Sequence, residues 1–410
     1  MLATEIDAFK NVIGIKREEL FVENLAGFVF ASPTGMISSK KIIQNIDFCR
    51  NQDLNFLQQQ QTWLDQAKQQ LQDQIKACSN TELIIVGSLA FDTRDLPELS
   101  IAEAKNTYLA DAAKGEHNNA FHLGSVEAKL LPQHAEYVGG VQKLVDLMQN
   151  TALKKAVLAR VVDLTVTEKI NILQLFYRLY QANPEGYTFA YAQNPTHHGW
   201  FMGASPELLV AKQNANVFSQ PVAGTLIRSE DATEDKLQAE RLLASSKDQS
   251  EHRLVIESIA DLLTPFCKEL HIPKKPSLIK TQTLWHLATS IQGKLKDPEL
   301  HVFDLVSVLH PTPAVCGAPA QLARALISEL EPFQRNLFAG TMGWSDAYGN
   351  GAWSVNVRCG RIHDQFARLY AGAGIVEASK PELELDETAA KFKTMLNALG
   401  LNTEQLIFTE

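Results

Sequence analysis

The feature that most limits the fold is a pair of alternating segments near the end of the chain. Residues 351–362 and 366–375 alternate apolar and polar side chains and are joined by a short polar turn, which predicts an antiparallel hairpin. Earlier segments follow as strands at 155–164, 188–193 and 199–212, and as helices at 171–182, 234–263 and 384–399. Antiparallel pairs with helices between them favour a mixed α+β fold over a doubly wound parallel sheet.

Residues 1–130 differ in texture from the rest and carry no recognisable chemistry. Residues 53–77 are rich in Gln, yet six apolar residues recur there at helical spacing: Leu54, Leu57, Trp63, Leu64, Ala67 and Leu71. This spacing predicts an amphipathic helix rather than a low-complexity tract. An apolar strand is expected at 83–91. We find no Gly/Pro/Ser linker, no short repeat and no nucleotide-binding glycine loop along the chain.

The charge balance excludes several classes of partner. With 38 Lys and Arg against 47 Asp and Glu, the formal net charge is -9, and no basic stripe is present to bind nucleic acid. The start, MLATEIDAFKNVIG, lacks a leader pattern, and no apolar run is long enough to cross a membrane. The five cysteines are scattered and odd in number, which predicts no disulfide framework or zinc site. We expect a cytoplasmic protein with no membrane partner.

Two helical segments carry carboxylates in unusual positions. Glu251 falls on the apolar face of its helix, with Asp248 one turn earlier, and Glu384, Glu387 and Lys391 form a polar stripe on the last helix. Each group has an ordinary explanation, either a glutamate that reaches solvent at the helix edge or a solvated face with an intrahelical ion pair. Two acidic pairs on two helices would equally suit Mg²⁺, which prefers oxygen ligands.

Three further residues are chemically out of place. Lys155 shares strand parity with apolar residues, so it either extends past the strand edge or has a lowered pKa and acts as a base. Arg358 lies on the polar side of its expected strand, which is either an exposed face or, beside the bare backbone of Gly372 and Gly374, a site for a carboxylate. Glu207 stands at the turn of GASPELLVAK, where a glutamate is usually unremarkable.

In ten ordered blocks the sequence strongly resembles the chorismate-utilising enzymes. The blocks are KAVLAR (155–160), GASPELL (203–209), VAGT (222–225), KDQSEH (247–252), LWHLAT (284–289), HPTPAVCGAP (310–319), RNLFAGTMGW (335–344), VNVRCGR (355–361), AGAGIVEAS (371–379) and ELDETAAK (384–391). The resemblance implies one large domain like that of anthranilate synthase component I, with antiparallel sheets and helices around a central active site. We expect a single domain over 1–410, with 1–130 a poorly matched N-terminal part and 131–402 the segment that carries the catalytic motifs.

The resemblance also implies a role for each motif residue. Lys155 matches the base that activates water and Glu207 the general acid. Glu251 and Glu387 match the glutamates that bind Mg²⁺, and Asp248 and Glu384 stand where outer groups would hold its water; Asp248 replaces a more usual Glu. The matched substrate contacts are Gly224, Thr225, His286, Ala314, Arg358, Gly372 and Lys391.

Within the family, Pro313 and Ala314 of HPTPAVCGAP resemble the isochorismate synthases, which convert chorismate to isochorismate. LWHLAT is more similar to siderophore-pathway enzymes that feed 2,3-dihydroxybenzoate than to menaquinone-pathway enzymes. The alternatives are a menaquinone-pathway isochorismate synthase, a salicylate synthase and a chorismate-binding paralogue without activity. The resemblance implies an isomerase that needs Mg²⁺ and acts as a monomer without a glutaminase subunit.

Overall fold

The computed structural model of the chain describes residues 25, 27–80, 82–107, 121–193, 199–402 and 408–409. The segment 1–24, including the start on which the absence of a leader was predicted, lies outside the described residues. Among the helices described, none is both long and apolar enough to cross a membrane.

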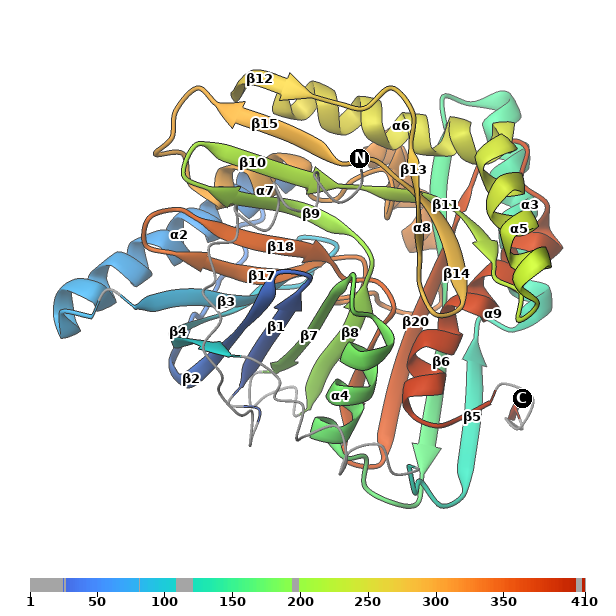
Figure 1. The fold of residues 1–410 in the computed structure, drawn as a ribbon, viewed down its shortest axis with the longest axis horizontal. Coiled ribbons are helices and arrows are strands. Elements are labelled where there is room, and N and C mark those ends of the chain that lie inside the picture. Colours follow the sequence, from blue (N-terminus) through green and yellow to red (C-terminus); the bar gives the residue numbers. More distant parts are fainter. Residues whose placement is uncertain are drawn as a thin grey trace.

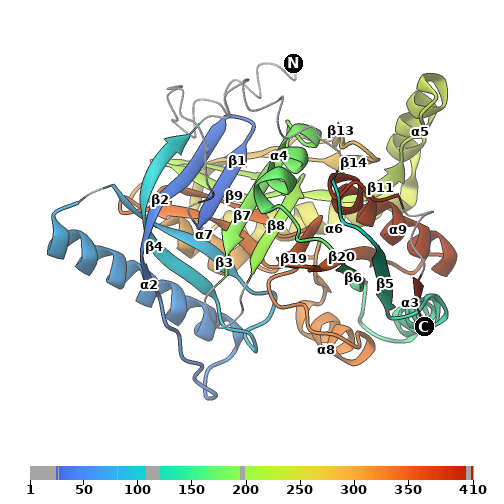
Figure 2. The same ribbon diagram turned by 90° about the horizontal axis from the view of Figure 1, so that it is seen from below.

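The helices differ in length and surround a continuous β-structure (Figures 1 and 2). They are α2 (Phe56–Cys78), α3 (His134–Asn150), α4 (Ile172–Ala182), α5 (Ala232–Ala244), α6 (Ser246–Leu263), α7 (Val302–Leu309), α8 (Ala320–Leu330) and α9 (Pro381–Ala398). α9 packs on the strand that follows the hairpin turn and also contacts α3 and α4, whereas α6 packs on the smaller sheet.

In the described part of the chain, 18 strands pair into one bent sheet. Its pairing order is β12 (Cys267–His271), β15 (Ile291–Leu295), β10 (Asn216–Gln220), β9 (Leu208–Gln213), β18 (Gly351–Val355), β17 (Thr341–Asp346), β3 (Leu83–Leu89), β4 (Glu98–Thr107), β2 (Gly35–Asn45), β1 (Phe28–Ser32), β7 (Tyr187–Ala192), β8 (Trp200–Ser205), β19 (Cys359–His363), β20 (Phe366–Ile375), β6 (Lys155–Val166), β5 (Val126–Leu131) and β21 (Phe408–Thr409), with β16 (Gly317–Ala318) also on β6. These pairings are antiparallel except β21 with β5. In Figure 1 the strands β9, β10, β17 and β18 run across those of β6, β7, β8 and β20.

A separate three-stranded antiparallel sheet lies beside the large one. It consists of β11 (Val222–Ile227), β14 (Leu284–Ala288) and β13 (Ser277–Lys280). The pairing of β11 with β14 shifts register between Ala223 and Thr225. Gly224, the residue between them, has φ of 81°, a conformation that a residue with a Cβ rarely adopts.

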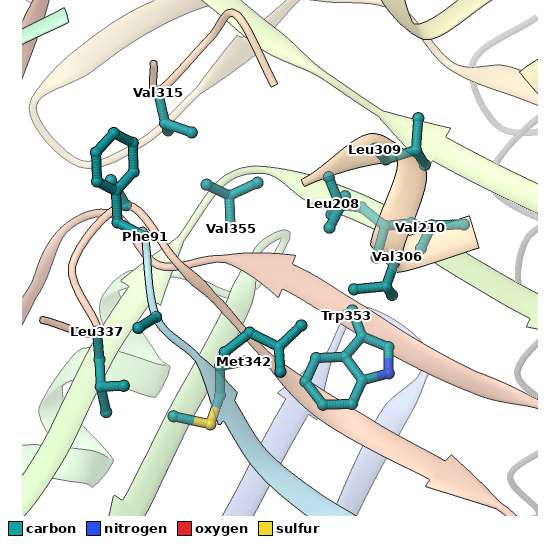
Figure 3. Packing of buried hydrophobic residues seen from close by; sticks show 14 of the residues in the cluster. Phe91, Leu208, Val210, Val306, Leu309, Val315, Leu337, Met342, Trp353 and Val355 are labelled. Carbon is teal, nitrogen blue, oxygen red and sulfur yellow. The ribbon is translucent and has the colours of Figure 1, made fainter. Parts of the chain in front are cut away.

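Strand alternation divides the apolar side chains between two cores. In β1, Phe28 and Phe30 enter the larger core, whereas Val29 and Ala31 face the smaller core under α4 and α9. Figure 3 shows part of the larger core, where Trp353 of β18 lies near Val306 of α7. Burial of each such side chain contributes about 1.5–3 kcal/mol.

One edge of β6 is completed by side chains instead of a neighbouring strand. β5 pairs with residues 161–166 and β16 with residues 155–156. Between them, the Ala159 amide donates to Glu331 (2.8 Å), and Arg335 donates to the Val157 carbonyl (2.7 Å). Glu331 and Arg335 are themselves a buried ion pair at 2.6 Å. Their contacts hold the start of β6 in place.

Several sequence predictions are confirmed. The mixed α+β architecture with antiparallel pairing is as predicted, and so are the elements observed as α2, β3, β6, α4, β7 and α9. The helix α2 buries Trp63, Leu64, Ala67 and Leu71, but Leu57 is exposed. Leu57 lies in the first turn of α2, which extends past the edge of the core, whereas the later turns pack on it.

Three predicted elements are each divided in two. The expected helix 234–263 breaks at Ser245, whose extended backbone ends α5 and whose side chain caps α6 by accepting from the Asp248 amide. The expected strand 199–212 breaks at Pro206 and Glu207, and 351–362 breaks between β18 and β19. Arg358 lies in that second break with φ of 54°, so its predicted place on a regular strand was wrong.

Candidate active site

Lys155 begins β6 and its side chain is fully buried. Its Nζ lies 2.8 Å from Oε1 of Glu251 on α6, an ion pair whose geometry is not that of an aligned hydrogen bond. Burial is the largest single effect and acts to raise the pKa of Glu251, but the contact and charge of Lys155, together with the charges of Lys247 and Lys391, outweigh it and hold that pKa below its usual value. Neither side chain is exposed to solvent, so the exposed explanation is excluded for both residues; the role of Lys155 as a base stays a prediction.

The small residues of β20 make room for this pair. Gly374 lies opposite Val157 of β6, and a Cβ built on it would stand 2.2 Å from Oε1 of Glu251 and 3.0 Å from Cε of Lys155. Any larger residue at 374 would have to displace the buried ion pair.

Glu207 lies in the tight turn between β8 and β9, where its amide donates to Oγ of Ser205 at 3.2 Å. The carboxyl is buried. Burial raises the pKa of Glu207 to about 7, against the opposing effects of the Val222 amide and the charges of Lys155 and Arg358. A carboxyl group with this pKa can donate a proton at neutral pH.

Arg358, His286 and Thr225 form a hydrogen-bonded chain across the site. Arg358 is 3.1 Å from Nε2 of His286, and Nδ1 of His286 is 3.1 Å from the Thr225 hydroxyl. Because a guanidinium only donates, Nε2 must accept, and the proton of the neutral ring is on Nδ1. Burial and the nearby positive charges lower the pKa of His286 well below its usual value, which keeps the ring neutral. His286 thereby links the two groups and fixes their orientation.

The second half of the site is acidic. Asp248 and Glu251 of α6 and Glu384 and Glu387 of α9 are placed by the caps of their helices, Ser245 and Lys380 with Pro381. Burial is the largest cause that raises the pKa of Asp248 and of Glu384, and neighbouring carboxylates raise both further. The charges of these four residues therefore act on one another, although they come from two helices.

Three lysines neutralise three of these acids. Besides the pair of Lys155 with Glu251, Lys247 lies 2.6 Å from Glu384 and Lys391 lies 2.6 Å from Glu387. Lys391 also donates to the Gly372 carbonyl at 2.6 Å. The intrahelical Glu–Lys pair of the ordinary explanation is thus present, but Glu384 and Lys391 are buried, so the stripe is not a solvated surface.

The donor chemistry of this acidic cluster, defined as Asp248, Glu251, Glu384 and Glu387, fits a hard divalent cation such as Mg²⁺. Among the residues that the structure describes, no three His, Cys, Asp or Glu side chains converge closely enough to hold a metal ion. Glu251, Glu384 and Glu387 are instead each paired with a lysine.

The predicted residues meet at one cavity of about 60 Å³. Ten of them line it: Glu207, Gly224, Thr225, Glu251, His286, Ala314, Arg358, Gly372, Glu387 and Lys391. The other three predicted residues do not line the cavity. Lys155 contacts the lining residue Glu251, and Asp248 and Glu384 each lie one helical turn before a lining glutamate, on α6 and α9. A larger cavity of about 260 Å³ lies between β13 and the start of β7, but the smaller one gathers the titratable groups with altered pKa values and is therefore the candidate active site.

Sequence reasoning missed several residues of the site. Val157, Phe338 and Val357 line the cavity, and only their place within matched motifs could have pointed to them. Lys247 was also missed. The sequence held no signal for it, because the expected helix 234–263 places residue 247 in its middle, whereas in the structure Lys247 lies in the first turn of α6, where cations are disfavoured.

Comparison with known proteins finds relatives over most of the chain. Residues 54–400 match the family model described as "Chorismate binding enzyme". The chain is 38% identical over 397 residues to isochorismate synthase DhbC of Bacillus subtilis, covering 94% of this chain and 97% of the relative. It is also 38% identical over 346 residues to the vibriobactin-specific isochorismate synthase of Vibrio cholerae, with coverages of 84% and 86%.

Solved structures show the same fold. The candidate 2,3-dihydroxybenzoate-specific isochorismate synthase DhbC of Bacillus anthracis superposes with a TM-score of 0.84 at 38% identity, over 92% of this chain and 97% of that one. Anthranilate synthase component I of Streptococcus pneumoniae has a TM-score of 0.68 at 22% identity, with coverages of 93% and 95%. The second match concerns the fold alone, and it confirms the predicted likeness to that architecture.

Proposed function

The chain belongs to the family of chorismate-binding enzymes, and on this premise we propose that its buried cavity converts chorismate to isochorismate. The chain is an isochorismate synthase, an isomerase that acts by adding water at ring C2 while the C4 hydroxyl leaves and the double bond migrates. The observation that carries the assignment to this cavity is the buried Glu207 with a pKa of about 7 close to the buried Lys155. These are an acid and a base within one enclosed site.

Each side chain has a proposed task. Lys155 takes a proton from the attacking water, and Glu207 in its protonated form gives one to the leaving hydroxyl, so the proton count balances over the cycle. To accept this proton, the amine of Lys155 has to be neutral when the water attacks. Burial of both groups excludes bulk water, which strengthens their interactions with the reacting atoms.

The substrate anchors surround these two groups. Arg358, oriented through His286, offers a guanidinium fork to the enolpyruvyl carboxylate, and the backbone of Gly224 and Thr225 provides further amides. Gly372, Ala314 and Lys391 make further contacts with the substrate. Glu251 and Glu387 would bind Mg²⁺ directly, and Asp248 and Glu384 would hold the water molecules bound to it. The cation would neutralise the ring carboxylate.

The test is the product spectrum of the purified chain. Chorismate and Mg²⁺ are incubated with the wild type and with Glu207→Gln, and the products are separated by chromatography. Isochorismate as the main product, lost in the variant, supports the proposal. Salicylate with stoichiometric pyruvate would instead identify a salicylate synthase, and an unchanged rate in Glu207→Gln would overturn the role of Glu207.

We also propose that the isochorismate serves a 2,3-dihydroxybenzoate siderophore. This is supported by the 38% identity to the DhbC and vibriobactin-specific enzymes. A deletion strain should fail to grow under iron limitation and recover with added 2,3-dihydroxybenzoate. Recovery with menaquinone alone would contradict the siderophore role.

The proposed working form is a cytoplasmic monomer without a glutaminase subunit, without nucleic acid and without a membrane partner. Its five cysteines are free, as is usual in a reducing compartment. Light scattering during gel filtration measures the mass, and turnover in ammonia-free buffer checks that no glutaminase is needed. A stable dimer, or a requirement for ammonia, would overturn the corresponding part.

A further inference from the structure

Lys247 is a basic residue beside the acidic cluster, and it has no role in the proposed reaction. Its Nζ lies 2.6 Å from Oε1 of Glu384, whose side chain is only 1% exposed. The carboxylates of Glu384, Glu387 and Glu251 outweigh partial burial and raise the pKa of Lys247 above its usual value. The ammonium group thus interacts with acids of both helices.

The position of Lys247 within α6 does not favour a cation. It is the second residue of an 18-residue helix, where the unpaired amides and the helix dipole disfavour positive charge. Asp248, the next residue, is the type that suits this end. What makes a lysine favourable at 247 is therefore the acidic cluster and not the helix that carries it.

The three lysine pairs differ in how readily they can open. The side chain of Lys155 is 0% exposed and that of Lys391 is 10% exposed, whereas that of Lys247 is 28% exposed. Of the three, Lys247 has the most solvent beside it, so its charged end group can move out with the least loss of hydration. When two positive charges enter the cluster, Lys247 is the cation that can leave at least cost.

We propose that Lys247 is a built-in counter-ion that neutralises the acidic cluster in the metal-free enzyme and competes with the divalent cation for it. This inference rests on the proposed function, because it concerns the metal site of the same enzyme. Lys247 thereby sets the affinity for Mg²⁺: it prevents mutual repulsion of the acids when the metal is absent, and it weakens binding of the metal.

Calorimetric titration of the full chain with Mg²⁺ tests the proposal. Lys247→Met removes the charge and keeps most of the side chain, so Mg²⁺ should bind about threefold to tenfold more tightly, the usual size of one partly exposed charge interaction. Lys236→Met is the matched control, since Lys236 is exposed on α5 with its partner Glu240 at 4.0 Å; its affinity should equal that of the wild type. Unchanged or weaker binding in Lys247→Met overturns the proposal.

Thermal unfolding separates competition from a purely structural ion pair. Lys247→Met should lower the midpoint in excess chelator and should lose less, or nothing, in saturating Mg²⁺. Equal losses in both conditions would mean that the ion pair only stabilises the fold, and the proposal would be wrong. Lys247→Arg keeps the charge and should restore wild-type affinity.

These readouts do not depend on turnover, so they are distinct from the product assay. A chain that makes no isochorismate but shows the tighter binding would overturn the proposed function and support this inference. A wild type that binds no Mg²⁺ would overturn the inference whatever the product.

Discussion

Glu207 links burial to pH dependence at the scale of one residue. Its pKa is raised from 4.5 to about 7 chiefly by burial. In the unfolded chain it titrates near the ordinary value. Its contribution to stability is therefore fully present below pH 4.5 and is lost as the pH rises towards 7, where ionising the buried carboxyl costs up to about 3 kcal/mol.

From this we predict that Glu207→Gln is inactive yet more stable than the wild type at pH 8, by up to about 3 kcal/mol. The gain should shrink to near zero at pH 4.5. Urea unfolding at both pH values measures it.

In the wild type, the same ionisation of Glu207 should make the turnover rate fall above pH 7, because the proton donor is then lost. A rate that is flat from pH 6 to 9 would contradict the role of Glu207.

A second prediction concerns the Lys155–Glu251 pair. Lys155→Met leaves a buried carboxylate without its partner, which should cost about 3–5 kcal/mol of stability as well as activity. The double variant Lys155→Met with Glu251→Gln should recover most of the stability but no turnover. Chemical denaturation of the two single variants and the double variant gives the coupling free energy. Additive losses would mean that the two side chains do not interact.

At this scale the sequence was informative about residue types and less so about their surroundings. The apolar arc of α6 correctly indicated that Glu251 is buried, because helical periodicity is local. The left-handed backbone of Arg358 was not predictable, since it follows from how β19 meets β8. The burial of Glu384 and Lys391 depends on α9 packing against β20 and α3, which is a long-range contact.

At the scale of elements, β20 shows how a strand of small residues serves a neighbouring site. Gly374→Ala should displace the Lys155–Glu251 pair, since its Cβ would overlap Oε1 of Glu251. We expect turnover to fall about 10²-fold, as for a misplacement of about 1 Å, while the circular dichroism spectrum is retained. Wild-type turnover in this variant would show that the pair tolerates displacement.

Gly139→Ala is the matched control for this substitution. Gly139 lies within α3, and a Cβ there meets nothing within 4 Å among the described residues. Turnover should be unchanged, and stability should rise by about 0.5–1 kcal/mol because alanine favours a helix.

Element boundaries were predicted less well than element types. Residues 234–263 have continuous helical character, and only the Ser245 cap divides them into α5 and α6. The Ser-x-x-Asp spacing of 245–248 is visible in the sequence, but the same spacing is common at places where no helix begins, so it does not by itself predict a cap. Similarly, the breaks at Glu207 and Arg358 place side chains in the site, where the demands of the cavity override strand propensity.

For the whole molecule, metal binding should stabilise the fold by mass action. At a Mg²⁺ concentration of about 100 times its Kd the gain is about 2.7 kcal/mol, which corresponds to about 3 °C in the unfolding midpoint of a chain of 410 residues. The shift is measured by comparing the thermal unfolding midpoint in excess chelator with that in saturating Mg²⁺. Chelator should also abolish turnover. A midpoint unaffected by Mg²⁺ would argue against a site in the acidic cluster.

The overall architecture was predictable because hairpin signals and motif order extend over most of the chain. The path of the sheet was not, since it joins strands from distant parts of the sequence. Two of the N-terminal strands pair with strands of the segment that carries the site: β1 pairs with β7, and β3 pairs with β17. This is compatible with the proposed single domain over 1–410.

The side-chain-completed edge of β6 has a consequence for synthesis of the protein. On this edge, β16, Glu331 and Arg335 all come much later in the chain, from Gly317 onwards, and so does β20 on the opposite edge of β6. A nascent chain can pair residues 161–166 with β5, but it presents the start of this apolar strand and its β20 edge with unpaired backbone until the ribosome has made residue 375, and such edges aggregate. Slow translation and chaperones that bind apolar strands should raise the yield of folded protein. Chains truncated at residue 330, which lack Glu331, Arg335 and β20, should be insoluble.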